Sequence, residues 1–456
     1  MSNDKIEELF LCEKYELDVY IITEDNKPIK GRLIINEEKI KLEIYNTPYG
    51  FKLNYDKLYC EYNNYNIELI NLSNLKYSTS FCSQTRDIAY NIEKILFKEY
   101  SAKDEYRKIV IKAKDINTWV GFTNFQHELA NDIDNRAYNF KTELFKSIKC
   151  NNFNFNIIYS KDINSDILNG ITTYKYLPYF ELEFQNILGF KEVEKIYFEL
   201  LDLFYLLLGF DLSVEQVIFE SEQNYYNKSY FYYKKDYEII KKDYVFISLA
   251  NDLFDQYREG LKLEIFPNYF QLDEYKKSFF KAFRKYKMFH YTEDKFLGYF
   301  RILENLMFNK EEKFTEKMLD IYIDNITIDE AEKLKEKKIL LEGNDKIKKV
   351  VDKPIIHRKE KIKFIVFHNK FINVLSNNYK LKVNFTDVEE IVKLRNDISH
   401  FNGYKITQND LEKYIDYLEL LLNYVLLRLV GYSDENFINN LRFYSFNHRV
   451  FKFENN

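Results

Sequence analysis

The sequence holds only four cysteines, Cys12, Cys60, Cys82 and Cys150, in 456 residues. Their spacing matches neither a zinc site nor the paired framework of a disulfide-rich secreted protein, which predicts a reducing, cytoplasmic setting. Glycine is also scarce, with eleven residues, and there is no glycine-rich phosphate loop and no dinucleotide-binding fingerprint. We therefore expect no nucleotide cofactor.

The motifs of common hydrolases are absent too. The chain contains no serine nucleophile elbow, no His-Glu-x-x-His pair and no clustered Asp/Glu pattern of a two-metal nuclease. If the chain cuts nucleic acid, we expect it to do so without a metal ion. Four of the six histidines have no companion residues and are interpreted as structural or incidental: His127, His357, His368 and His448.

No apolar run is long enough to cross a membrane. The two most apolar runs, 196–210 and 414–430, carry charged residues and fall short of the roughly 20 apolar residues that a span needs. The N-terminal residues 1–5 are polar, and no apolar core of a signal peptide follows them. We expect a soluble protein in which both runs are buried helices.

The overall charge limits the type of nucleic-acid binding. A net charge of −5 argues against a protein that coats nucleic acid, so any RNA contact must be local. The forty Tyr and forty Phe residues accompany many Lys, Asn and Ile residues. This mixture is typical of AT-rich codons, and we attribute most of the aromatic excess to it.

The length of the chain predicts two or three domains, and the patterns predict an α+β fold. We expect a β-rich N-terminal domain over 1–190, with a regulatory or sensor role. A helical connecting region follows over 191–291, and an all-α bundle over 292–456. The strands expected in the first part include 57–62, 67–72, 108–113, 153–159 and 179–184, and alternation predicts a hairpin on either side of residues 36–38.

Several features of these regions have two interpretations. Trp119, the only tryptophan, is predicted as a core or interface anchor rather than a stacking platform for a ligand. The Tyr-rich stretch 225–237 matches a base-stacking surface, but we favour a solvated hairpin or loop. Helices are predicted at 192–210, ending at Gly209, and at 247–257, 273–287, 292–307 and 361–375. A last helix follows the capping box that begins at Thr407.

The most informative stretch is 394–403, at the end of another predicted helix. The capping box at Thr386 starts this helix, and its apolar stripe runs through Ile391 to Ile398. Arg395 occupies a stripe position, where a buried charge needs a partner. Glu304, beside the stripe of the 292–307 helix, is a candidate partner; a solvent-facing Glu304 is the alternative.

The spacing of the motif also suggests its chemistry. Asn396 and His400 are four residues apart and share a helix face, so the amide can orient the imidazole. Arg395 and His400 are about 140° apart on an ideal helix. They converge on one substrate if the helix ends near Ser399, with Gly403 as a stop, or if a second copy faces the first. Arginine and histidine suit a phosphodiester, because the guanidinium stabilises phosphoryl charge and the imidazole transfers protons near neutral pH.

The Arg395–His400 motif, in its helical setting, resembles the Arg-x4–6-His signature of HEPN domains, which are all-helical modules that include metal-independent endoribonucleases. The 31–45 hairpin and the 108–123 stretch with Asn117-Thr118-Trp119 are similar to ApeA-type anti-phage proteins. The resemblance implies an abortive-infection ribonuclease that cleaves tRNA or another host RNA when a phage-derived component triggers it. It also implies a homodimer or higher oligomer in which two motifs face each other.

In this interpretation Arg395, His400 and Asn396 are catalytic, and Glu304 and Ser399 support them. Residues 333–370 hold thirteen Lys and Arg against five Asp and Glu, which predicts either a solvated helix face or a basic rim that guides RNA. The RNA-binding candidates in this segment are Lys346, Lys348, Lys349 and Arg358. Two alternatives remain: a non-catalytic HEPN module that binds a nucleotide or a partner, and a compact RNA-guided CRISPR ribonuclease.

Overall fold

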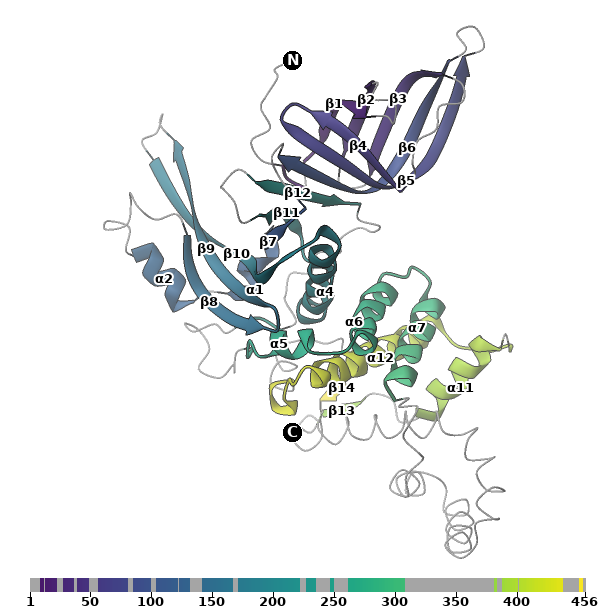
Figure 1. The fold of residues 1–456 in the computed structure, drawn as a ribbon. Helices are drawn as coiled ribbons and strands as arrows, with labels where there is room; N and C mark the ends of the chain where they lie inside the picture. The colour runs from purple at the N-terminus through teal and green to yellow at the C-terminus, as the bar shows by residue number, and fades with distance from the viewer. Residues whose placement is uncertain are drawn as a thin grey trace, which may run out of the picture. The chain divides into compact units, whose positions relative to one another are not determined.

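A computed structural model of the chain describes two compact units, 1–271 and 272–456, and the fold is α+β (Figure 1). The described residues are 9–11, 13–22, 28–36, 39–48, 56–80, 85–99, 104–121, 123–131, 142–166, 171–221, 227–234, 247–249, 261–307, 381–383, 388–400, 402–437 and 451–453.

The first six strands form a closed ring. They are β1 (Tyr15–Ile22), β2 (Ile29–Ile35), β3 (Ile40–Pro48), β4 (Lys57–Tyr62), β5 (Tyr65–Ser80) and β6 (Thr85–Glu99). Neighbouring strands pair antiparallel, and the pairings β1–β4 and β3–β6 close the ring. Strict alternation explains this arrangement, because Leu17, Val19 and Ile21 of β1 are buried while the residues between them are exposed.

Strand β6 joins the ring to a second set of strands. Its first half pairs with β3, and its second half pairs with β12 (Lys228–Tyr233). The sheet then continues through β11 (Val214–Glu220), β7 (Tyr106–Ala113), β10 (Ile171–Leu188), β9 (Phe153–Asp166) and β8 (Thr142–Cys150). One sheet of twelve strands therefore runs through the whole first unit.

The described part of the first unit contains four helices. They are α1 (Lys114–Val120), α2 (Asn124–Asn131), α4 (Phe190–Leu208) and α5 (Ile265–Phe270). The indole of Trp119 is fully buried and meets the rings of Phe180, Phe204 and Phe266 at centroid distances of 5.5, 5.0 and 6.2 Å. The prediction of a core role for Trp119 is confirmed.

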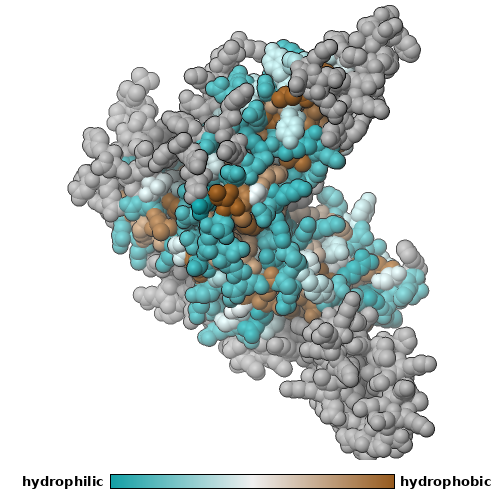
Figure 2. Space-filling view, viewed as in Figure 1, coloured by the Kyte–Doolittle hydropathy of each residue, from teal (hydrophilic) through white to brown (hydrophobic). Residues whose placement is uncertain are grey.

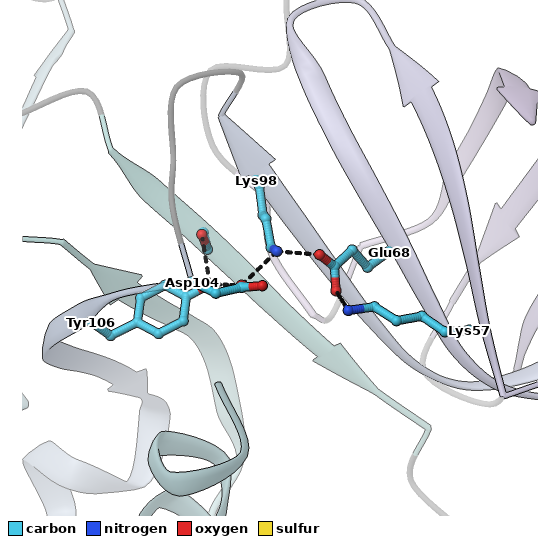
Figure 3. A network of polar contacts seen from close by, with 6 residues as sticks. Lys57, Glu68, Lys98, Asp104 and Tyr106 are labelled. Atoms are coloured by element: carbon cyan, nitrogen blue, oxygen red, sulfur yellow. Dashed lines mark hydrogen bonds and ion pairs between the residues drawn. The ribbon is translucent and has the colours of Figure 1, made fainter. Parts of the chain in front are cut away.

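A buried network of charged side chains lies on this sheet (Figure 3). The ammonium of Lys98 on β6 lies between the carboxylates of Glu68 on β5 and Asp104, and Glu68 also pairs with Lys57 on β4. Asp104 accepts a hydrogen bond of 3.1 Å from the hydroxyl of Tyr106 on β7. Positive and negative side chains thus alternate along the network, which lowers the free-energy cost of burying Lys98 and Glu68.

The second unit contains helices α6 (Glu274–Lys287), α7 (Thr292–Met307), α11 (Val388–Ser399) and α12 (Gln408–Leu429), and a short sheet of β13 (Leu381–Val383) and β14 (Phe451–Phe453). Helix α7 contacts α6, α11 and α12. Gly298 allows the close packing of α6, because a Cβ there would lie 2.4 Å from the ring of Tyr286. Aromatic and leucine side chains of α7 and α12 fill the core between the helices.

Most predicted elements are confirmed. Strand β4 has the predicted bounds, the other predicted strands lie within β5, β7, β9 and β10, and the hairpin at 36–38 is the β2–β3 pair. Helix α4 ends before Gly209, whose φ of 80° gives the left-handed backbone that glycine adopts freely. Asp273 caps α6, and Thr407 caps α12 by accepting a hydrogen bond from the Asp410 amide.

The prediction for the Tyr-rich stretch is half right: β12 forms a hairpin with β11, as predicted, but the hairpin is not solvated. Residues 228–233 form β12, a strand inside the sheet, and Tyr230, Phe231 and Tyr232 are buried. The range predicted as a helical connecting region also contains β11, so it contributes two strands to the sheet. Residues 247–249 are not helical: the amides of Ile247 and Leu249 bond to the carbonyls of Leu207 and Trp119. The rest of the helix predicted at 247–257, and the one at 361–375, lie outside the described residues.

The surface of the described residues is mainly hydrophilic in the view of Figure 2, where hydrophobic residues appear in small groups. Tyr20, Ile22 and Tyr59 are among the large hydrophobic side chains that remain exposed. None of the helices in the described part of the chain combines the length and apolar composition that a membrane crossing requires.

Candidate functional site

Helix α11 carries the Arg-x4-His motif. Its side chains Ile391, Val392 and Ile398 are buried, as the apolar stripe predicted. The helix ends at Ser399, which agrees with the predicted end near this residue. Its described start is Val388, and the capping residues Thr386 and Asp387 lie outside the described residues.

The guanidinium of Arg395 is held from three sides. It forms an ion pair with the Glu304 carboxylate of α7, and its Nη1 donates a hydrogen bond of 2.9 Å to the Asn396 side-chain oxygen. Its central carbon lies 5.7 Å from the centroid of the Phe300 ring, within the range of a cation–π contact. Both charged side chains are largely buried, at 20% exposure for Arg395 and 14% for Glu304. The predicted partnership of Arg395 and Glu304 is present in the structure.

His400 lies in the turn that follows α11. Its amide bonds to the Asn396 carbonyl at 3.0 Å, so the backbone continues one residue past the helix in helical fashion. The amide of Asn402 then bonds to the Asp397 carbonyl at 2.9 Å and closes the turn. His400, Ser399 and Asn396 are all exposed, so these polar side chains are accessible from solvent.

The role predicted for Gly403 is wrong. The helix ends four residues before it, and its backbone does not adopt the left-handed conformation of a glycine cap. Gly403 has open space where a Cβ would lie. The hydrogen bond of Asn402 to the Asp397 carbonyl closes the turn instead.

A second anchor follows the motif. The hydroxyl of Tyr404 donates a hydrogen bond to the Glu293 carboxylate in the first turn of α7, and this bond raises the pKa of Tyr404 to about 12. The Gln408 side chain reaches the Thr292 hydroxyl at 3.5 Å. Helix α7 therefore binds the chain on both sides of His400. Neither the bond of Tyr404 nor the contact of Phe300 with Arg395 was predicted, since the sequence alone does not show which side chains of α7 meet the chain around the motif.

The RNA-binding candidates belong to a segment that the structure does not describe. Lys346, Lys348, Lys349 and Arg358 lie outside the described residues, so their role in RNA binding stays a prediction. Within the described ranges, no group of three or more His, Cys, Asp and Glu side chains is placed to hold a metal ion. The catalytic roles of Arg395, Asn396 and His400 also stay predictions.

Comparison with protein families identifies the first unit. The model of ApeA N-terminal domain 1 matches residues 18–269, more than half of the chain. The chain belongs to this family. Membership associates it with anti-phage defence and confirms the resemblance of the 31–45 and 108–123 segments, which both lie within the match. No curated protein and no solved structure matches the chain significantly.

The ApeA N-terminal domain match and the motif occupy different parts of the chain. The matched residues end at 269, two residues before the end of the first compact unit. Arg395 and His400 lie in the second unit, so the family match neither includes nor tests them. The chemistry of the second unit has to be inferred from its own residues.

Proposed function

We propose that this ApeA-family chain is a metal-independent endoribonuclease of the HEPN type, acting in abortive infection. The observation that supports the proposal is the paired state of Arg395. A guanidinium on the apolar stripe of α11 is held by Glu304, Asn396 and Phe300, while His400 is exposed one turn further along. In the proposed reaction Arg395 is the fixed cation and His400 the proton carrier that act on one phosphodiester.

The reaction takes its nucleophile from the substrate and not from the protein. RNA carries its own nucleophile, the 2′-hydroxyl, next to each phosphate. A base removes the 2′-hydroxyl proton, the oxygen bonds to phosphorus, and the bond from phosphorus to the 5′-oxygen breaks as an acid protonates that oxygen. The products are a 2′,3′-cyclic phosphate and a 5′-hydroxyl.

In this mechanism the residues have separate tasks. His400 transfers a proton, and Arg395 stabilises the charge on the pentacoordinate phosphorus. Asn396 accepts a hydrogen bond from the Arg395 guanidinium, and in the proposed reaction its amide orients the imidazole or binds a phosphate oxygen. Glu304 fixes Arg395, and Ser399 presents a hydroxyl beside His400 at the helix end.

The proposal extends to the assembly and its control. One histidine per motif serves one of the two proton transfers, so we infer that two chains combine their motifs around one RNA. The ApeA N-terminal domain then restrains the ribonuclease until a phage-derived component binds.

The test is cleavage of labelled RNA by the purified full chain in EDTA, compared with the His400→Ala variant. We expect cleavage by the parent chain and a loss of at least about 100-fold in the variant, the contribution typical of general acid–base catalysis. Undiminished cleavage by His400→Ala rules out this site. Tight RNA binding without cleavage by the parent favours the non-catalytic alternative.

A further inference from the structure

Helices α7 and α11 run antiparallel, with the motif along one face of α7. Arg395 in α11 contacts Glu304 near the end of α7, and Tyr404 beyond α11 contacts Glu293 in the first turn of α7. Glu293 and Glu304 are eleven residues apart, about three full turns, and therefore share a face. His400 lies between these two anchors in the chain.

The exposed sides of the two helices open in the same direction. On α11, each residue is rotated by about 100° around the helix axis relative to the one before it. Measured from Arg395, the exposed side chains lie at positive angles, and these are Ser399, Asn396 and His400. The buried Ile398 lies at a negative angle. On α7, angles are measured from Glu304, which contacts Arg395. The exposed Arg301 also lies at a positive angle from that residue. Two antiparallel right-handed helices turn in opposite directions when both are viewed along one axis. Positive angles from the contact between the helices therefore point to the same solvent-exposed side of the pair.

Arg301 also lies at the level of the motif. It is three residues before Glu304, about 4.5 Å towards the N-terminus of α7, and His400 is about 7.5 Å from Arg395 in the same direction. Side chains in a helix tilt towards its N-terminus, which directs Arg301 towards the level of His400. The two arginines and the imidazole therefore border one exposed surface.

The two arginines differ in their partners. Glu304 neutralises Arg395, whereas Arg301 forms no ion pair with any residue that the structure describes. A guanidinium without an acidic partner is available to bind phosphate, for which its planar fork is well suited. An RNA strand that places one phosphate at Arg395 and His400 presents the neighbouring phosphate beside them.

We propose that Arg301 binds the RNA phosphate next to the scissile one and so fixes the register of the strand at the motif. This inference rests on the proposed function, because it takes RNA as the ligand. Arg301 contributes to binding of the substrate, and Arg395 with His400 to the reaction itself.

The test measures binding separately from cleavage. A fluorescent single-stranded RNA is titrated with full-length His400→Ala protein, with and without Arg301→Gln, at several salt concentrations. We expect Arg301→Gln to weaken binding about fivefold or more and to reduce the slope of log affinity against log salt by about 0.7, the value for one lost phosphate contact on a single strand. Arg301→Lys is expected to retain most of the binding, since it keeps the charge.

Lys285→Gln, an exposed cation on α6, is the matched control and is expected to change little. Equal affinity with and without Arg301→Gln overturns the inference, as does an equal loss with Lys285→Gln or a parent that binds no RNA. The proposed function fails in a different way: RNA that is bound through Arg301 but not cleaved by the wild-type chain leaves Arg301 as an RNA-binding residue and contradicts the ribonuclease activity.

Discussion

Arg395 is the residue on which the account of the second unit depends. It occupies a position where an apolar side chain is expected, and its charge is compensated by Glu304, one turn after Phe300 on α7. The pair costs desolvation on both sides, so it stabilises the fold less than a hydrophobic contact of the same size. We interpret the presence of this ion pair as a sign that Arg395 takes part in the proposed reaction.

The substitution Glu304→Gln tests this interpretation. It keeps the shape of the side chain but leaves the guanidinium with a neutral partner, so we expect RNA cleavage to fall about 10-fold or more. The stability of the second unit should fall by about 1–3 kcal/mol, because the largely buried guanidinium loses its opposite charge and keeps only a hydrogen bond to a neutral amide oxygen. The measurements are cleavage rate and thermal unfolding, with the exposed Glu435→Gln as control. Full activity of Glu304→Gln contradicts the role assigned to the pair.

The sequence predicted part of this residue-level geometry. The stripe positions predicted Arg395 and Glu304 as candidate partners, since Arg395 lies on the apolar stripe of one helix and Glu304 lies beside the stripe of another. The bond between Tyr404 and Glu293 joins residues 111 positions apart and has no periodic signal. Gly403 was misread because the turn is closed by Asn402 bonding to the Asp397 carbonyl, which requires no left-handed residue.

At the scale of elements, strand β6 organises the first unit. It completes the ring through β3 and carries the sheet on through β12. The network of Lys57, Glu68, Lys98 and Asp104 lies where β4, β5 and β6 meet the segment that leads into β7 (Figure 3). Lys98 and Glu68 are nearly inaccessible, so each depends on the other's charge.

Replacing Lys98 by Met should destabilise the first unit by about 3 kcal/mol, since it removes one of the two cations of a buried carboxylate. The double variant Lys98→Met with Glu68→Leu should be less destabilised, because the remaining Lys57 and Asp104 are 37% and 48% exposed and reach water. Trp119, the only tryptophan, lies in the first unit, so its fluorescence during urea unfolding reports on this unit alone. A double variant less stable than the single one contradicts the account.

The elements were predictable where their patterns are local. Strand β4 and helices α4, α6 and α12 follow from alternation, helical spacing and capping residues. The burial of β12 was missed because its tyrosines and the lysines that flank them look like a solvated segment. Its place is fixed by pairing with β6, about 130 residues earlier in the chain, and no local pattern shows that pairing.

At the scale of the whole molecule, the chain joins an ApeA N-terminal domain to a helical unit that carries the motif. In the proposed function, a phage-derived trigger acts on the ApeA N-terminal domain and releases the ribonuclease activity of the unit that carries the motif. The three functional ranges predicted from the sequence stay predictions, since the compact units divide the chain once, at 271.

The proposed pairing of two motifs makes a prediction about assembly. The purified chain should have a mass in solution of at least twice the 55.6 kDa of one chain. Adding an excess of His400→Ala chains to the parent chain should lower cleavage below the value expected from dilution alone, because a mixed pair supplies one histidine for two proton transfers. A fully active monomer, measured by light scattering at the assay concentration, contradicts the prediction.

The most direct test of the central claim is the chemistry of the cut. An RNA substrate is compared with the same substrate carrying a single 2′-deoxy sugar on the 5′ side of the cleaved bond. We predict that the RNA gives a 2′,3′-cyclic phosphate and a 5′-hydroxyl, and that the deoxy substrate is not cut at that bond. Cleavage of the deoxy substrate at the same bond, or products with a 5′-phosphate, would show that the 2′-hydroxyl is not the nucleophile and contradict the mechanism.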